Sequence, residues 1–182
     1  MRGPFDKVFA GNEVAAKEDP PRCGPTVASS GHTVGVCAYP ITDLSKFLRG
    51  SWDLARDIVG ADGAVAGRFA GVGVFTVREG LLYYEESGRL RIGDRRSEAT
   101  RSLRYRPERA EYCTVWFDDG HFFHDLRLDS GIWQVGHPCG QDHYGGTFEV
   151  FDSDQWRQSW YVSGPGKTYS LITRYTRLPR AR

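Results

Sequence analysis

The sequence lacks three features, each of which would point to a particular class of protein. It has no run of 18 apolar residues, so it offers no candidate for a membrane-spanning helix. Lysine plus arginine number 24 against 23 aspartate plus glutamate, so no strong basic field exists to attract nucleic acid. The four cysteines show no CxxC spacing, which argues against a zinc ribbon or a redox motif.

The first 20 residues also lack the apolar segment of a signal peptide. Charged residues occur there instead, among them Lys7, Glu13, Lys17, Glu18 and Asp19. We therefore expect a cytoplasmic protein whose cysteines are free thiols. A disulfide between Cys23 and Cys37 is the alternative for that pair.

Residues 1–38 differ in composition from the rest of the chain. They are rich in proline and small residues and show no sustained hydrophobic period. Such a segment has no apolar face to bury, so it is predicted to be a poorly ordered leader. The folded domain is then expected to span residues 39–182. Its first element is a short helix over residues 42–48, with Thr42 or Asp43 as the N-cap and Gly50 after its end.

From Trp52 onward, short apolar segments alternate with turn residues at intervals of about 8–12 residues, a pattern typical of strands. The expected strands cover residues 52–58, 65–77, 81–86 (extended or followed by 89–92), 99–106, 111–117, 121–128, 132–139, 144–151, 155–162 and 168–178. Pro107 is expected to end the strand before it. Residues 118–120 and 129–131 predict tight hairpin turns.

Sequential hairpins with no long helical segment between them predict an all-β fold. The favoured architecture is a single antiparallel up-and-down β-barrel of about ten strands, because closure removes exposed sheet edges. A two-sheet sandwich is the alternative. A barrel of about ten strands has an interior wide enough for one small ligand.

The motif Gly50-Ser51-Trp52 stands directly after the expected helix, at the start of the first strand. It resembles the opening Gly-x-Trp of lipocalins and related calycins. This resemblance implies a tryptophan that plugs one end of the barrel and an arginine of the last strand that stacks over it. Arg174 and Arg177 are the candidates, since a guanidinium stacks well on an indole face.

Residues 40–178 resemble more closely an uncharacterised calycin-like family that is common in actinobacteria. Four stretches carry this resemblance: residues 47–52, 119–126, 137–146 and 162–169. The resemblance implies a barrel like those of lipocalins and fatty-acid-binding proteins. The family is defined by sequence, so the resemblance implies no particular activity.

The segment from His137 to Tyr144 is the richest in reactive side chains. On a strand, His137 and Cys139 point to the same side. Gly140 permits a bulge that would turn Asp142 and Tyr144 towards the same space. An imidazole, a thiol, a carboxylate and a phenol at one point would suit acid–base catalysis. The alternative is a structural corner, in which Asp142 binds backbone amides and Cys139 is a small buried apolar side chain.

His124 is the second candidate for chemistry. It lies on an otherwise apolar strand face, where a histidine is usually a core residue. The turn at residues 129–131 would pair His124 with Gly136 or His137 on the following strand. Two histidines facing one interior would form a proton relay or a ligand clamp.

Metal and haem binding are alternatives that lack a supporting spacing. His124, His137, Cys139 and Asp142 are the residues that would hold zinc, and a single histidine would ligate haem. We therefore expect no cofactor.

Aromatic residues make up 13% of the chain and gather in its second half. Apolar walls with a few polar groups are typical of ligand pockets. The predicted ligand-binding residues are His124, His137, Cys139, Tyr144, Trp133, Trp156, Trp160, Tyr105 and Lys167. Lys167 follows a hairpin turn and is expected to lie over the barrel mouth. Arg56 and Arg101, with Tyr105, are candidates for further inward polar groups.

Three functions fit these patterns. The first is a small-molecule-binding barrel for an apolar or aromatic ligand, with no nucleic-acid or membrane partner, as a monomer or homodimer. The second is a cofactor-independent cyclase, isomerase or hydrolase of a secondary metabolite. There His137 or His124 would be the acid or base, Asp142 would orient it, and Tyr144 would polarise the substrate. The third is a structural or partner-binding module with a filled interior.

Overall fold

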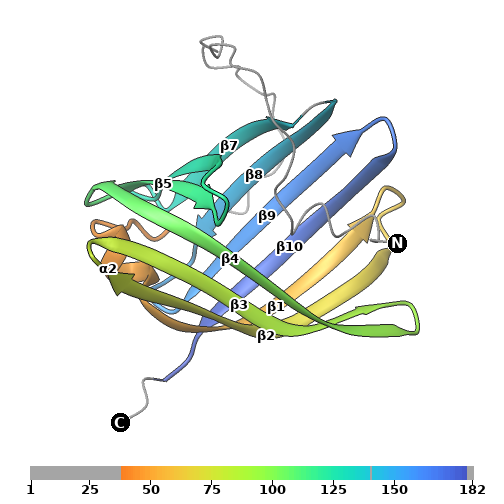
Figure 1. Ribbon diagram of the computed structural model, residues 1–182, viewed down its shortest axis with the longest axis horizontal. Helices are drawn as coiled ribbons and strands as arrows, with labels where there is room; N and C mark the ends of the chain where they lie inside the picture. Colours follow the sequence, from red (N-terminus) through yellow and green to blue (C-terminus); the bar gives the residue numbers. More distant parts are fainter. Residues whose placement is uncertain (1–37, 140, 180–182) are drawn as a thin grey trace.

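The described part of the chain consists of one short helix and ten antiparallel strands (Figure 1). The computed structural model describes residues 38–139 and 141–179, and for residues 137–139 the backbone alone. The elements are α2 (Leu44–Leu48), β1 (Gly50–Gly60), β2 (Val65–Arg78), β3 (Leu81–Ile92), β4 (Arg95–Arg109), β5 (Tyr112–Phe117), β6 (Phe122–Arg127), β7 (Ile132–Cys139), β8 (Asp142–Val150), β9 (Gln155–Gly164) and β10 (Lys167–Arg177). The predicted leader lies outside the described residues, apart from Ala38.

All ten strands form one sheet in the order β6-β5-β4-β3-β2-β1-β10-β9-β8-β7. The first and last strands pair antiparallel, from Trp52 opposite Arg177 to Gly60 opposite Tyr169. The sheet therefore curls into a nearly closed up-and-down barrel. This confirms the predicted fold class and shows that the two-sheet sandwich is wrong.

The barrel has one seam without a described ladder, between β6 and β7 at the two ends of the sheet. The predicted pairing of these two strands is therefore wrong. Near one end of this seam, the backbone of the segment before α2 donates hydrogen bonds to neighbouring carbonyls. The amide of Tyr39 donates to the Val150 carbonyl and that of Ile41 donates to the Leu128 carbonyl, both at 2.9 Å. The segment before α2 thus bridges Leu128, which follows β6, and Val150 at the end of β8.

Two strand boundaries also differ from expectation. Residues 81–86 and 89–92 belong to one continuous strand, β3, and β4 begins at Arg95 rather than at Ala99. Pro107 does not end β4, because it lies opposite Cys113 next to a register shift that ends at Arg109. A proline needs no ladder donor at such an irregularity.

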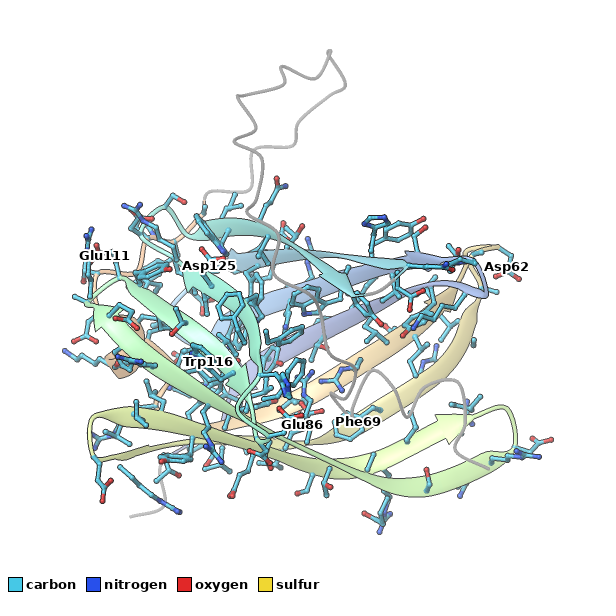
Figure 2. The ribbon with its side chains drawn as sticks, turned by 45° about the horizontal axis from the view of Figure 1, so that its top comes forward. Asp62, Phe69, Glu86, Glu111, Trp116 and Asp125 are labelled. Carbon is cyan, nitrogen blue, oxygen red and sulfur yellow. The ribbon has the colours of Figure 1, made fainter. Side chains whose placement is uncertain are left out.

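Side chains alternate between the interior and the surface along the barrel strands, most regularly in β1 and β10. Helix α2 and the segment before it cover one end of the barrel, where the amide of Leu44 donates to the carbonyl of Ala110 at 2.6 Å. Figure 2 shows Glu86 and Phe69 near the middle of the molecule, whereas Glu111 and Asp62 lie at opposite ends. We call the end with α2 the closed end and the end with Asp62 the open end.

Trp52 plugs the closed end, as the calycin resemblance implied. Its side chain is fully buried and its indole N–H donates to the Leu48 carbonyl at 2.8 Å. The guanidinium of Arg177 lies 4.0 Å from the centre of the Trp52 ring. Arg177 also donates to the carbonyls of Phe47, Arg49 and Ser153, so it ties the helix to the β8–β9 turn. Arg174, the other candidate, pairs with Asp57 on the surface instead.

Candidate functional site

The barrel interior holds a buried group of charged side chains, which we call the arginine–glutamate cluster (Arg56, Glu86, Arg101, Thr173 and Tyr84). The two terminal nitrogens of Arg56 on β1 donate hydrogen bonds to the two carboxylate oxygens of Glu86 at 2.8 and 2.9 Å. Its Nε donates to the hydroxyl of Thr173 at 2.7 Å. The hydroxyl of Tyr84 donates to the same carboxylate at 2.6 Å. Four hydrogen-bond donors therefore fix the Arg56–Glu86 pair at the inner wall.

Arg101 of β4 completes the cluster less tightly. Its Nη2 reaches Glu86 Oε2 at 3.3 Å, and its Nε is buried without a hydrogen-bond partner among the described residues. The Arg101 side chain is 9% exposed, against 2% for Arg56 and 1% for Glu86. Two guanidiniums thus share one carboxylate, and the cluster carries a net charge of +1.

The electrostatics of the cluster keep Glu86 ionised. Burial acts to raise the pKa of Glu86, but the charges of Arg101 and Arg56, with their hydrogen bonds, outweigh it and lower that pKa to about 2. Burial also raises the pKa of Tyr84 well above its ordinary range, so this phenol stays protonated and acts as a donor. The pKa of Arg101 is raised, because the attraction of Glu86 exceeds the effect of burial.

A second interior group lies at the seam and consists of aromatic rings. A bulge in β6 places His124 opposite Val115 and Phe122 opposite Trp116, with Phe123 between them at the register shift. The bulge turns Phe123 inward beside His124, with ring centres 4.6 Å apart.

These two rings reach the strands beyond the seam. Phe123 stacks on Trp160 of β9 at 5.0 Å, and His124 lies 5.2 Å from Trp160 and 5.3 Å from Phe148 of β8. His124 Nδ1 is 2.8 Å from the Asp125 carbonyl. We call Phe123, His124, Phe148 and Trp160 the seam aromatic cluster.

Trp160 holds its place because Gly146 on the neighbouring strand lacks a side chain. A Cβ at Gly146 would lie 2.9 Å from the indole ring. The indole Nε1 of Trp160 is buried and has no hydrogen-bond partner among the described residues. The indole of Trp156 shares this property but stacks on Tyr175 at 3.8 Å near the plug.

A third group lies towards the open end and joins three of the predicted residues. Lys167 forms a 2.6 Å ion pair with Asp142 and donates to the Tyr144 hydroxyl at 3.1 Å. Burial alone would lower the pKa of Lys167, but these hydrogen bonds outweigh it and raise the pKa. The ammonium is therefore held in its charged form by an internal carboxylate.

The remaining predicted residues are distributed around the barrel. Tyr105 is buried against Phe75, with ring centres 5.3 Å apart. Trp133 is half-buried, and its indole N–H crosses the seam to the Asp125 carbonyl at 3.0 Å. The backbones of His137 and Cys139 pair with Tyr144 and Asp142 in the β7–β8 hairpin, and their side chains lie outside the described part. The convergence of His137 and Cys139 on the site stays a prediction.

Sequence reasoning named Arg56 and Arg101 but missed Glu86, the residue that joins them. The usable signal was the strand period, because Glu86 lies two residues after Tyr84 and four after Leu82 and so shares their inward face. Two adjacent glutamates obscured that signal, since Glu85 is exposed and Glu86 is buried.

Within the described residues, no three histidine, cysteine, aspartate or glutamate side chains gather to hold a metal ion. The described part also contains no helix of the length and apolarity needed to cross a membrane. The thiol of Cys113, the free cysteine among the described side chains, is buried on the inner wall, and burial raises its pKa.

Comparison with known sequences identifies the family. Residues 48–177, from the end of α2 to the last strand, match the model described as "Family of unknown function (DUF6314)". The chain belongs to this family. The matched region begins before the Trp52 plug and ends at Arg177, so it contains the whole barrel. No curated protein matches the sequence.

Two solved structures share the fold. An S-type phycobiliprotein lyase, CPES from Guillardia theta, is 8% identical, with a TM-score of 0.55 over 75% of this chain and 92% of that chain. A protein of unknown function from the DUF3598 family of Nostoc punctiforme PCC 73102 is 13% identical, with a TM-score of 0.51 over 80% of this chain and 52% of that chain. At such identities the likeness concerns the barrel alone.

Proposed function

We propose that the barrel binds one small apolar or aromatic molecule in its interior. The observation that carries this proposal is the buried indole N–H of Trp160, which has no hydrogen-bond partner among the described residues. An unsatisfied buried donor costs about 1–3 kcal/mol. A ligand acceptor beside the seam aromatic cluster would satisfy it, and the surrounding rings would bury the ligand's apolar surface.

Access to the interior is supported by side chains that face inward and yet keep some exposure. Leu90 and Ala99 on one wall, and Trp133, Val135 and Tyr144 on another, pack on the core and are only partly buried. These positions lie on the strands β3, β4, β7 and β8. A small molecule entering between them would meet apolar surface and, beside Tyr144, the Lys167–Asp142 ion pair.

The phycobiliprotein lyase of Guillardia theta shares the barrel fold at 8% identity. We take from it the scaffold and not the reaction. The composition extends the proposal to a cytoplasmic monomer or homodimer without nucleic-acid or membrane partners. We propose no cofactor, with zinc and haem as the alternatives already stated.

The acid–base enzyme is the second hypothesis, and it needs Asp142 to orient a histidine. In the structure the Asp142 carboxylate is paired with Lys167 at 2.6 Å. That ion pair favours binding over catalysis as the role of the open end, because the carboxylate already has a cationic partner.

A fluorescence titration with 1-pyrenebutanol, a neutral aromatic alcohol, tests the proposed function. Ala99 faces inward and Thr100, the next residue on β4, faces outward and is exposed. We expect wild type and Thr100→Trp to bind the probe alike, and Ala99→Trp to bind at least about tenfold more weakly, because a filled lumen excludes the ring. Failure of wild type to bind, or equal binding by the two variants, would overturn the proposal.

A further inference from the structure

The charge balance of the arginine–glutamate cluster points to the chemical class of the ligand. We propose that the interior ligand carries one carboxylate, which binds Arg101 beside the Arg56–Glu86 pair. This inference rests on the proposed function, because it assumes that a ligand enters the barrel.

Three of the five N–H donors of Arg56 are already engaged within the cluster. Its two terminal nitrogens hold the two oxygens of Glu86 and its Nε holds Thr173, all at 2.7–2.9 Å. A bidentate pair of this kind is the strongest arrangement that an arginine and a carboxylate form. Arg56 and Glu86 are therefore held to each other by a bidentate ion pair.

Arg101, in contrast, is held less tightly by hydrogen bonds within the cluster. Its contact with Glu86 is long, at 3.3 Å, and it uses an oxygen that already accepts from Tyr84 and Arg56. Its Nε is buried with no hydrogen-bond partner among the described residues, and the side chain as a whole is 91% buried. The cluster therefore keeps a net charge of +1 and one buried N–H donor without an acceptor in the described part of the chain, and such a donor is costly.

One added anion would correct both deficits. It would bring the charge of the cluster to zero and give the Arg101 Nε an acceptor. A carboxylate fits, because a planar guanidinium presents parallel N–H donors to it. The ligand body would then lie along the inward face of β4 towards Ala99, which keeps part of its surface exposed. The interior ligand is therefore expected to be an amphiphile with a small acidic head and an apolar or aromatic body.

The test compares 1-pyrenebutyrate with 1-pyrenebutanol, which differ in the carboxylate alone. At pH 7.5 we expect wild type to bind the carboxylate about 10- to 100-fold more tightly, the range of a charge-assisted hydrogen bond. Arg101→Gln should abolish this preference, so that the variant binds the two probes with equal affinity. The variant should fold, because Glu86 keeps Arg56 and Tyr84 as partners.

The matched control is Arg104→Gln, on the same strand with its side chain exposed and bonded to the Asp118 carbonyl. This variant should keep the preference in full. Equal affinities of wild type for the two probes, or a preference that survives Arg101→Gln, would overturn the carboxylate site and leave the proposed function standing. If neither probe binds wild type, the proposed function itself has failed, and the carboxylate site with it.

Discussion

Replacing Glu86 with glutamine removes the one negative charge of the arginine–glutamate cluster and preserves the shape of the side chain. The carboxyl is 1% exposed, and its pKa is lowered from 4.5 to about 2. A shift of this size corresponds to about 3 kcal/mol of folding free energy at neutral pH, which agrees with the cost of breaking a buried ion pair. We expect Glu86→Gln to be less stable than wild type by about 3 kcal/mol at pH 7.

The pH dependence follows from the sign of the shift. Because the pKa of Glu86 is lower in the folded state than in the unfolded state, its contribution is present above about pH 5 and is lost as the pH falls towards 2. By pH 3, about 2 kcal/mol of it should be gone. Wild type should therefore approach the stability of Glu86→Gln in acid, since a protonated carboxyl and an amide are both neutral.

Urea unfolding followed by tryptophan fluorescence at pH 7, 5, 4 and 3 measures this convergence. Subtracting the variant from wild type removes the effect of every other carboxyl group. Asp53→Asn, an exposed position on β1, is the control and should differ from wild type by less than about 0.5 kcal/mol at pH 7. A difference between wild type and Glu86→Gln that stays constant from pH 7 to pH 3 would refute the role assigned to the cluster.

Two further stability predictions concern the plug and the close strand contacts. Arg177→Ala should lower the free energy of unfolding by about 2–4 kcal/mol, because it removes the cation over Trp52 and several hydrogen bonds to carbonyls. Arg174→Ala removes a surface ion pair and should lower it by at most about 1 kcal/mol. Equal decreases for the two variants in urea unfolding would contradict this prediction. Gly71→Ala should cost about 1–3 kcal/mol, since its Cβ would collide with the backbone of β3. Gly145→Ala meets nothing within 4 Å and should shift the urea midpoint little.

Much of the fold could be predicted because strands and turns are local. The Asp-Gly sequence at residues 119–120 predicted the β5–β6 hairpin, and Gly120 has a φ of +87°, which an L side chain rarely adopts. The position of Trp52, together with the calycin resemblance, indicated the plug. The sequence could not choose between Arg174 and Arg177, because that choice depends on how far β10 runs past the closed end.

The seam between β6 and β7 could not be predicted from local signals. The turn at Gly131 is tight, as expected, but a non-local segment beginning at Tyr39 occupies the adjacent backbone groups. The same limit applies to the site. Glu86 meets Arg56 only when β1, β2 and β3 pair in the right register, because β2 lies between the two residues.

A crystal structure of the protein with 1-pyrenebutyrate tests the central claim most directly, because it shows where a ligand lies. The account predicts one pyrene inside the barrel, with its carboxylate within about 3 Å of Arg101 Nε. Its ring should lie on the inner wall near Ala99 or the seam aromatic cluster. A pyrene bound only on the outer surface of the barrel, or an interior without ligand at saturating concentration, would contradict the account.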